Sequence, residues 1–119
     1  MKTGRDKKIA EEIRREVSQI LHFEMSDPRL IGVTITGVKV SSDLRFARIY
    51  FGTPGAEVRK EPILNGLKKS TGHVRHLLAG RLNMKFVPQI EFFYDESFEI
   101  EARLQQIFKD MPKTEKSEE

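Results

Sequence analysis

The stretch PILNGLKKSTGHVRHLLAGRLN, residues 62–83, decides the fold of this chain. Gly72 interrupts it halfway along, directly after Ser70 and Thr71, and a glycine inside a helix costs about 1 kcal/mol relative to alanine. The apolar spacing predicts one helix, whereas these small residues favour a bend. We therefore expect two helices that meet at a kink formed by Ser70, Thr71 and Gly72. The apolar residues that recur at the spacing of one buried helix face are Ile63, Leu64, Leu67, Val74, Leu77, Leu78 and Leu82.

The same stretch lies in the most basic part of the chain. The 119 residues carry a net charge of +3, but residues 59–85 hold seven Lys or Arg and one acid. Residues 91–119 hold four bases and nine acids. This asymmetry predicts a directional basic surface in the middle of the chain, of the kind that binds nucleic acid.

Composition narrows the class of protein. A chain of 119 residues with 38% hydrophobic residues fits one domain, expected over residues 1–111, with a disordered charged tail at 112–119. Because cysteine is absent, disulfides and thiolate metal sites are excluded and a cytoplasmic setting is compatible. The sequence holds no run of about 20 apolar residues and no signal-peptide pattern, so neither a membrane span nor secretion is expected.

The segments before residue 62 predict one helix and two strands. A helical apolar pattern covers Lys7–Glu24, with Asp6 placed to cap it. Alternating apolar residues predict a strand over Ile31–Val40, with a change of parity at Gly37 that indicates a bulge. A second strand is expected over Leu44–Phe51, antiparallel to the first because the turn between them is short.

The segments after residue 83 predict a third strand and a final helix. The strand covers Phe86–Tyr94, and its paired part is expected to begin at Gln89 because Pro88 cannot donate to a ladder. Ser97 is placed to cap a helix that runs to Met111. The fold class is therefore α+β, with helices on one face of a three-stranded sheet. The residues of the last helix that are spaced for packing are Ile100, Leu104, Ile107 and Phe108.

This order of elements resembles the bacterial ribosome-binding factor A family. The resemblance is collinear over about residues 5–110. The residues that carry it are Asp27-Pro28-Arg29-Leu30, the run Gly32–Ser41, Asp43-Leu44, Ala47, Ile49, Tyr50, Gly66-Leu67, Gly72, Val74-Arg75, Leu78, Val87-Pro88, Ile90, Phe92, Asp95, Ser97 and Glu99.

The resemblance implies a type II KH-like fold and a role in assembly of the small ribosomal subunit. Such a protein binds the immature particle and its rRNA and promotes late maturation and processing of that rRNA. The family implies an Ala-x-Gly joint in place of the GxxG loop with which KH domains clamp nucleic acid. Here the corresponding residues are Ser70-Thr71-Gly72, so serine stands where the family pattern has alanine.

Candidate RNA-binding residues follow from charge and helical placement. Lys68, Gly72 and Arg75 fall on one edge of the helix, where a phosphate backbone would approach closely past the glycine. Arg45 and Arg48 on the second strand either extend this surface or keep a sheet face soluble. The second strand also carries Phe46 and Tyr50, and aromatic residues in such positions are more often core residues than base-stacking platforms. The full candidate set is Lys68, Lys69, Gly72, His73, Arg75, His76, Arg81, Lys85, Arg45 and Arg48.

Catalysis and metal binding have weaker support. His73 and His76 have the spacing of a zinc pair, but no convincing third ligand is nearby. Asp95, Glu96 and Glu99 are explained by turn and helix-start chemistry more simply than by acid–base work. No phosphate-binding glycine motif and no nucleophile with a readable base occur. We therefore expect a monomeric RNA-binding protein that is not an enzyme and has no metal or other cofactor. The alternative is a protein-interaction module that docks through its first helix or its acidic C-terminal segment.

Overall fold

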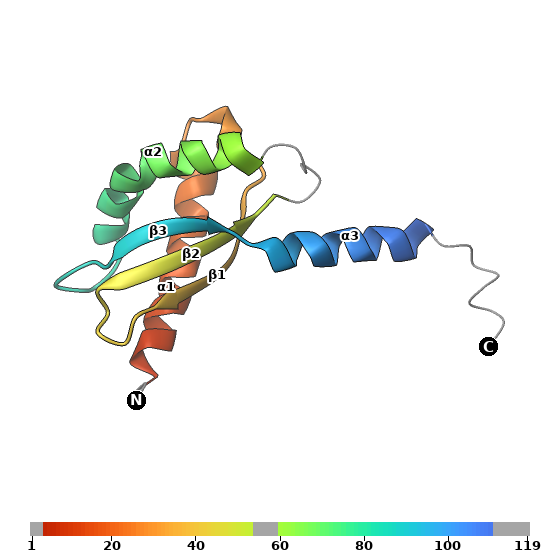
Figure 1. Ribbon diagram of the computed structural model, residues 1–119. Coiled ribbons are helices and arrows are strands. Elements are labelled where there is room, and N and C mark those ends of the chain that lie inside the picture. Colours follow the sequence, from red (N-terminus) through yellow and green to blue (C-terminus); the bar gives the residue numbers. More distant parts are fainter. Residues whose placement is uncertain (1–3, 54–59, 111–119) are drawn as a thin grey trace.

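The computed structural model describes residues 4–53 and 60–110. Figure 1 shows α1 and α2 against a three-stranded sheet, from which α3 projects. The α+β class is confirmed, while the tail expected at residues 112–119 lies outside the described residues. The elements in chain order are α1 (Arg5–Gln19), the π-helical turn η1 (Ile20–Glu24), the 3-10 turn η2 (Pro28–Leu30), β1 (Thr34–Val40), β2 (Phe46–Gly52), α2 (Lys60–Ala79), β3 (Gln89–Tyr94) and α3 (Glu96–Asp110).

The sheet has the order β1-β2-β3 and is mixed. β1 and β2 are antiparallel, as expected from their short turn, and the register shifts between Ile35 and Gly37, so the predicted bulge is confirmed. β2 and β3 are parallel. Because parallel neighbours require a crossover connection, α2 must return across one face of the sheet.

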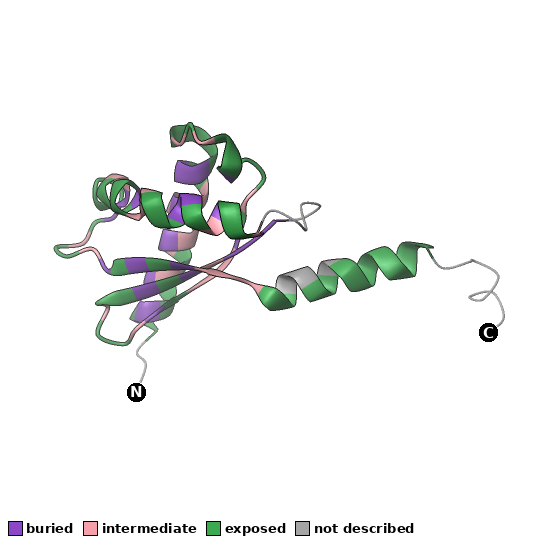
Figure 2. Cartoon of the chain, turned by 45° about the horizontal axis from the view of Figure 1, so that its top comes forward, coloured by how far each residue is buried: buried purple, intermediate pink, exposed green. Residues whose placement is uncertain are grey.

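The hydrophobic core lies between that face and the two helices. The central strand provides Ile49 and Phe51, which have no exposed surface, and Figure 2 shows the buried residues gathered where α1 and α2 meet the sheet. The opposite face of the sheet carries exposed Arg48 and Glu91, which pair across β2 and β3. The helical residues that are also fully buried are Ile13, Val17, Ile20, Leu67, Val74 and Leu78.

One continuous α2 replaces the predicted pair of helices. Lys60–Ala79 stays helical through Gly72, whose φ is not positive, so the expectation of two separate helices that meet at Ser70, Thr71 and Gly72 is wrong. Figures 1 and 2 show that the axis of α2 changes direction between its first and last turns. The Thr71 hydroxyl donates to the Leu67 carbonyl at 2.9 Å, and such a bond to the preceding turn bends a helix. The bend therefore lies inside one helix.

Both strands of the hairpin begin later than the sequence predicts. β1 starts at Thr34 rather than Ile31, because Gly32 has a φ of +87° and Ile31 is 81% exposed. β2 starts at Phe46 rather than Leu44, because Leu44 has a φ of +62° inside the turn. In the sequence, the alternation of apolar residues continues beyond the paired strands into segments whose backbone turns away from the sheet, so the predicted strands were too long.

The first helix has no side-chain cap. It begins at Arg5, and the residue before it, Gly4, has a left-handed backbone with a φ of +87°. Asp6 is therefore not the cap but lies in the first turn, where it is 5% exposed. A carboxylate in the first turn of a helix is favourable, because the backbone N–H groups there carry partial positive charge.

The last helix forms as expected but does not pack as expected. Glu96 begins it, so Ser97 lies within the first turn and does not cap it; the Ser97 hydroxyl donates to Asp95 Oδ1 at 2.7 Å. The predicted packing face is solvent-exposed, because α3 projects beyond the sheet (Figure 1). The exposed fractions are 56% for Ile100, 49% for Leu104, 53% for Ile107 and 65% for Phe108.

Gly66, not Gly72, is the glycine of α2 against which other side chains pack closely. A Cβ at Gly66 would lie 3.3 Å from Asp27 Oδ2 and 3.4 Å from Arg29 Cζ. These two side chains form an ion pair at 2.7 Å that rests on the helix. At Gly72 a Cβ would meet nothing within 4 Å.

Alanine substitutions test this distinction. Gly72→Ala is expected to stabilise the fold by up to about 1 kcal/mol, because it removes glycine from an open helical position. Gly66→Ala is expected to gain less or to destabilise, because its Cβ presses on the Asp27–Arg29 pair. Thermal melts followed by circular dichroism measure both. A lowered midpoint for Gly72→Ala would contradict a continuous helix.

Candidate nucleic-acid interface

The solvent side of α2 forms a basic face. Its opposite side buries Leu67, Val74 and Leu78 in the core, so the helix presents one apolar and one polar side. Within α2 the acid is Glu61, in the first turn, and the later turns carry bases but no carboxylate. We use the name α2 basic face for a group of exposed residues in the middle of this helix: Lys68, Lys69, Gly72, His73 and His76.

The two lysines of this face are available for a ligand. Within residues 4–53 and 60–110, neither Lys68 nor Lys69 forms a salt bridge. The nearby carboxylate of Asp27 is already engaged, because it accepts hydrogen bonds from the side chain and backbone of Arg29. These bonds hold the pKa of Asp27 below its usual value. Lys69 lowers that pKa by a smaller Coulombic contribution. The lysine charges are thus not cancelled by a bound partner.

Arg75 has a structural role that its spacing did not reveal. Its guanidinium donates to the Pro88 carbonyl at 3.0 Å and to the Val87 carbonyl at 2.7 Å. These bonds tie α2 to the loop that precedes β3. Arg75 is exposed, as expected for the solvent edge of the helix, but its charged group is also engaged in these two bonds within the protein.

Arg81 is also engaged within the protein. It lies just beyond the end of α2 at Ala79. Its guanidinium pairs with Glu16 at 3.4 Å and with Glu24 at 2.7 Å. Two carboxylates thus balance its charge, and Arg81 fastens the end of α2 to α1 and η1.

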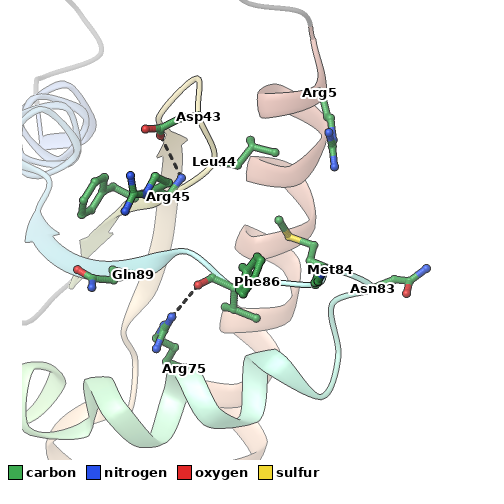
Figure 3. A pocket seen from close by; sticks show the side chains of 12 residues that line it. Arg5, Asp43, Leu44, Arg45, Arg75, Asn83, Met84, Phe86 and Gln89 are labelled. Carbon is green, nitrogen blue, oxygen red and sulfur yellow. Dashed lines mark hydrogen bonds between the residues drawn. The ribbon is translucent and has the colours of Figure 1, made fainter.

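A second group of bases surrounds a cleft of about 640 Å³ at the end of the sheet near the β1–β2 turn (Figure 3). The cations in its lining are Arg5, Arg45, Arg75 and Lys85. They come from α1, the β1–β2 turn, α2 and the loop before β3, as Figure 3 shows for the residues it labels. We call this site the basic cleft. Among its described lining residues the single acid is Asp43, whose Oδ1 accepts bonds from the Ser41 hydroxyl and the Arg45 amide.

Two phenylalanine side chains line the basic cleft beside these cations. Phe46 is 54% exposed and Phe86 is 77% exposed, so neither belongs to the core. The expectation that Phe46 is more often a core residue is wrong for this strand end. Lys85 Nζ lies 5.8 Å from the centre of the Phe86 ring, which places a cation next to an aromatic face.

Arg48 lies apart from both groups. It is on the face of the sheet opposite the helices, where its guanidinium lies 5.8 Å from the centre of the Phe93 ring. Tyr50 lies on the same face, with its ring 5.8 Å from that of Phe93. The structure therefore brings together Arg45, Arg75 and Lys85, groups the lysines and histidines on α2, and separates Arg48 from them.

Several functional candidates were missed in the sequence. Arg5 and Phe86 line the basic cleft but lie far from its other residues along the chain, so spacing did not connect them. Their available signal was weak: Phe86 directly follows Lys85, and Arg5 opens a helix. Nothing in a helical pattern indicated that the Asp27–Arg29 ion pair packs against Gly66.

The described residues hold no group of three or more His, Cys, Asp or Glu side chains that would bind a metal ion. In the same part of the chain no helix has both the length and the apolar character needed to cross a membrane. His73 and His76 stand exposed on α2 as separate surface residues. The arrangement offers charge and ring surface to a ligand.

Comparison with known proteins agrees with this geometry. A family model described as Ribosome-binding factor A matches residues 5–108. Ribosome-binding factor A from Geobacter metallireducens is 42% identical over 107 residues, which are 90% of this chain and 91% of the relative. The crystal structure of ribosome-binding factor A from Thermus thermophilus has a TM-score of 0.66 at 23% identity, covering 75% of this chain and 93% of that chain.

A second structure places the Thermus thermophilus protein in a larger particle. It is a homology model of ribosome binding factor A fitted into a cryo-EM map of a 30S complex of that protein. It has a TM-score of 0.61 at 24% identity and covers 73% of this chain and 91% of that chain, so it shows a shared fold. The family match and the identity over most of the chain decide the assignment: this chain belongs to the ribosome-binding factor A family and has its KH-like α+β fold.

Proposed function

We propose that this chain binds the immature small ribosomal subunit through its rRNA and promotes late maturation and processing of that rRNA. The observation that carries the proposal is the α2 basic face, where Lys68 and Lys69 stand exposed and form no salt bridge with the described residues. Family membership supports the proposal, as does the 30S complex of the Thermus thermophilus relative.

The contacts proposed for this face are contacts to phosphate. Lysine is a point charge on a flexible stem, so it neutralises a phosphate without fixing its orientation. Gly72 leaves the surface of the helix open beside Lys68, because nothing within 4 Å would meet even a Cβ there. Phosphate contacts position a protein but carry no sequence information, so selection among RNA sites comes from the shape of the particle.

The role is binding and not catalysis. The described residues place charged groups and aromatic rings at the surface, and the family name describes a binding factor. We propose that the protein acts as a cytoplasmic monomer without a cofactor. The other candidate function, docking to a protein, is favoured by the exposed apolar residues of α3, which belong to the acidic end of the chain.

Charge reversal tests the proposed RNA contact. The double variant Lys68→Glu/Lys69→Glu is expected to bind immature small subunits at least about tenfold more weakly, because two attractions become two repulsions. Pelleting with purified particles measures binding, and circular dichroism checks the fold. Arg103→Glu/Lys109→Glu is the matched control, since it makes the same change of charge on α3 and should bind normally. Equal binding by a folded α2 variant would remove this face from the interface.

Salt dependence separates the two candidate functions. For about four phosphate contacts the affinity is expected to fall roughly 50-fold between 50 and 200 mM potassium chloride at constant magnesium, because binding releases counterions. The slope should be shallower for Lys68→Glu/Lys69→Glu. An affinity that does not change with salt would instead support a protein interface formed by the apolar residues of α3.

A further inference from the structure

We propose that the basic cleft binds a single-stranded RNA segment, with an unstacked base laid against the exposed rings of Phe46 and Phe86. This inference rests on the proposed function and adds to it a second contact region and the kind of RNA it accepts. It concerns the end of the sheet near the β1–β2 turn, and its cleft residues other than Arg75 lie outside α2.

The aromatic rings are the first reason for this assignment. A phenylalanine side chain in a small domain is normally withdrawn from water, yet Phe86 is 77% exposed and Phe46 is 54% exposed at one cleft. When a base stacks on such a ring, the facing surfaces of the base and of the ring are both removed from water, and this contact tolerates any base. In a duplex the flat faces of the bases are covered by their neighbours, so only a single strand presents them.

The charges around the rings are the second reason. Arg45 and Lys85 lie in the lining together with both rings, and the carboxylate of Asp43 is taken up by hydrogen bonds within its own turn. Cations interleaved with aromatic rings are the usual combination for single-stranded nucleic acid, since the cations follow the backbone while the bases stack. An apolar protein segment would leave these cations without a partner.

The cleft walls are held in place before any ligand arrives. The backbone amide of Gln89 donates to the Arg45 carbonyl at 2.9 Å and joins the starts of β2 and β3. Arg75 donates hydrogen bonds to the Val87 and Pro88 carbonyls and so anchors the loop that carries Phe86. Figure 3 shows Arg75 hydrogen-bonded to this loop. Because the loop is tied to a helix, binding loses little conformational entropy. The volume of about 640 Å³ lies within the range of pockets that hold small organic ligands, a size that suits one or two nucleotides.

Binding to short RNAs tests the proposal. The probes are fluorescein-labelled eight-nucleotide oligouridylate and oligoadenylate and an eight-base-pair RNA duplex, titrated by fluorescence anisotropy. The wild-type chain is expected to bind both single strands more tightly than the duplex. Phe46→Leu/Phe86→Leu is expected to bind the single strands about tenfold more weakly and the duplex unchanged, because leucine keeps apolar volume but cannot stack.

A matched control and a second readout make the result specific. Phe23→Leu changes a phenylalanine that is 75% exposed on η1, away from the cleft, and should leave all affinities unchanged. A single 2-aminopurine within oligoadenylate should change its fluorescence on binding to the wild-type chain and not on binding to Phe46→Leu/Phe86→Leu.

Three results would overturn the inference: no binding of single strands by the wild-type chain, equal binding of single strand and duplex, or unchanged binding by the folded leucine variant. None of these affects the proposed function, which is tested separately with small-subunit particles and the Lys68→Glu/Lys69→Glu variant. If that test fails while the cleft binds single strands, the cleft would be an RNA site without the proposed ribosomal role.

Discussion

The parallel pairing of β2 with β3 is the constraint on which the rest of the structure depends. Two consecutive parallel strands cannot be joined by a tight turn, so the chain must cross the sheet between them. That crossing is α2, whose apolar side faces the hydrophobic core and packs mainly against β3. Burial of one side of α2 turns its other side, with Lys68 and Lys69, toward solvent. The position of the basic face is therefore a consequence of sheet topology.

The bases of this region divide into two kinds by the chemistry of their side chains. Arginine has a rigid fork of donors that matches carbonyl and carboxylate oxygens. Arg75 and Arg81 use this fork within the protein, on the loop before β3 and on two glutamates of the first helical segment. Lys68 and Lys69 have flexible, strongly hydrated groups and stay in solvent. A count of positive charges overstates what is available to a ligand, because half of these four arginine and lysine residues stabilise the fold.

The two regions of positive charge suit different features of RNA. The α2 basic face is open and is formed by one element, so it fits a backbone of phosphates on a folded particle. The basic cleft takes its cations from four segments and contains exposed rings, so it fits bases that have left a helix. Arg75 connects them, because it lies on α2 next to the basic face and also anchors one wall of the cleft. A change at Arg75 would thus alter loop position as well as charge.

The sequence by itself determined the elements, because hydrophobic periodicity is a local property. It predicted the first helix, the three strands, the bulge at Gly37 and the helical character of residues 62–79, and it placed the basic cluster on α2. It also carried the family resemblance that the comparisons confirmed.

Only the tertiary structure decided which of these residues meet. The strand order joins positions that are distant in the sequence. So do the contact of the Asp27–Arg29 ion pair with Gly66, the bonds of Arg75 and Arg81, and the cleft that both Arg5 and Phe86 line. The exposed apolar stripe of α3 is a further example. Its apolar residues have the spacing of a packed helix, although no described element covers them. Periodicity shows that a side can be buried, but the partner that buries it is set by the path of the whole chain.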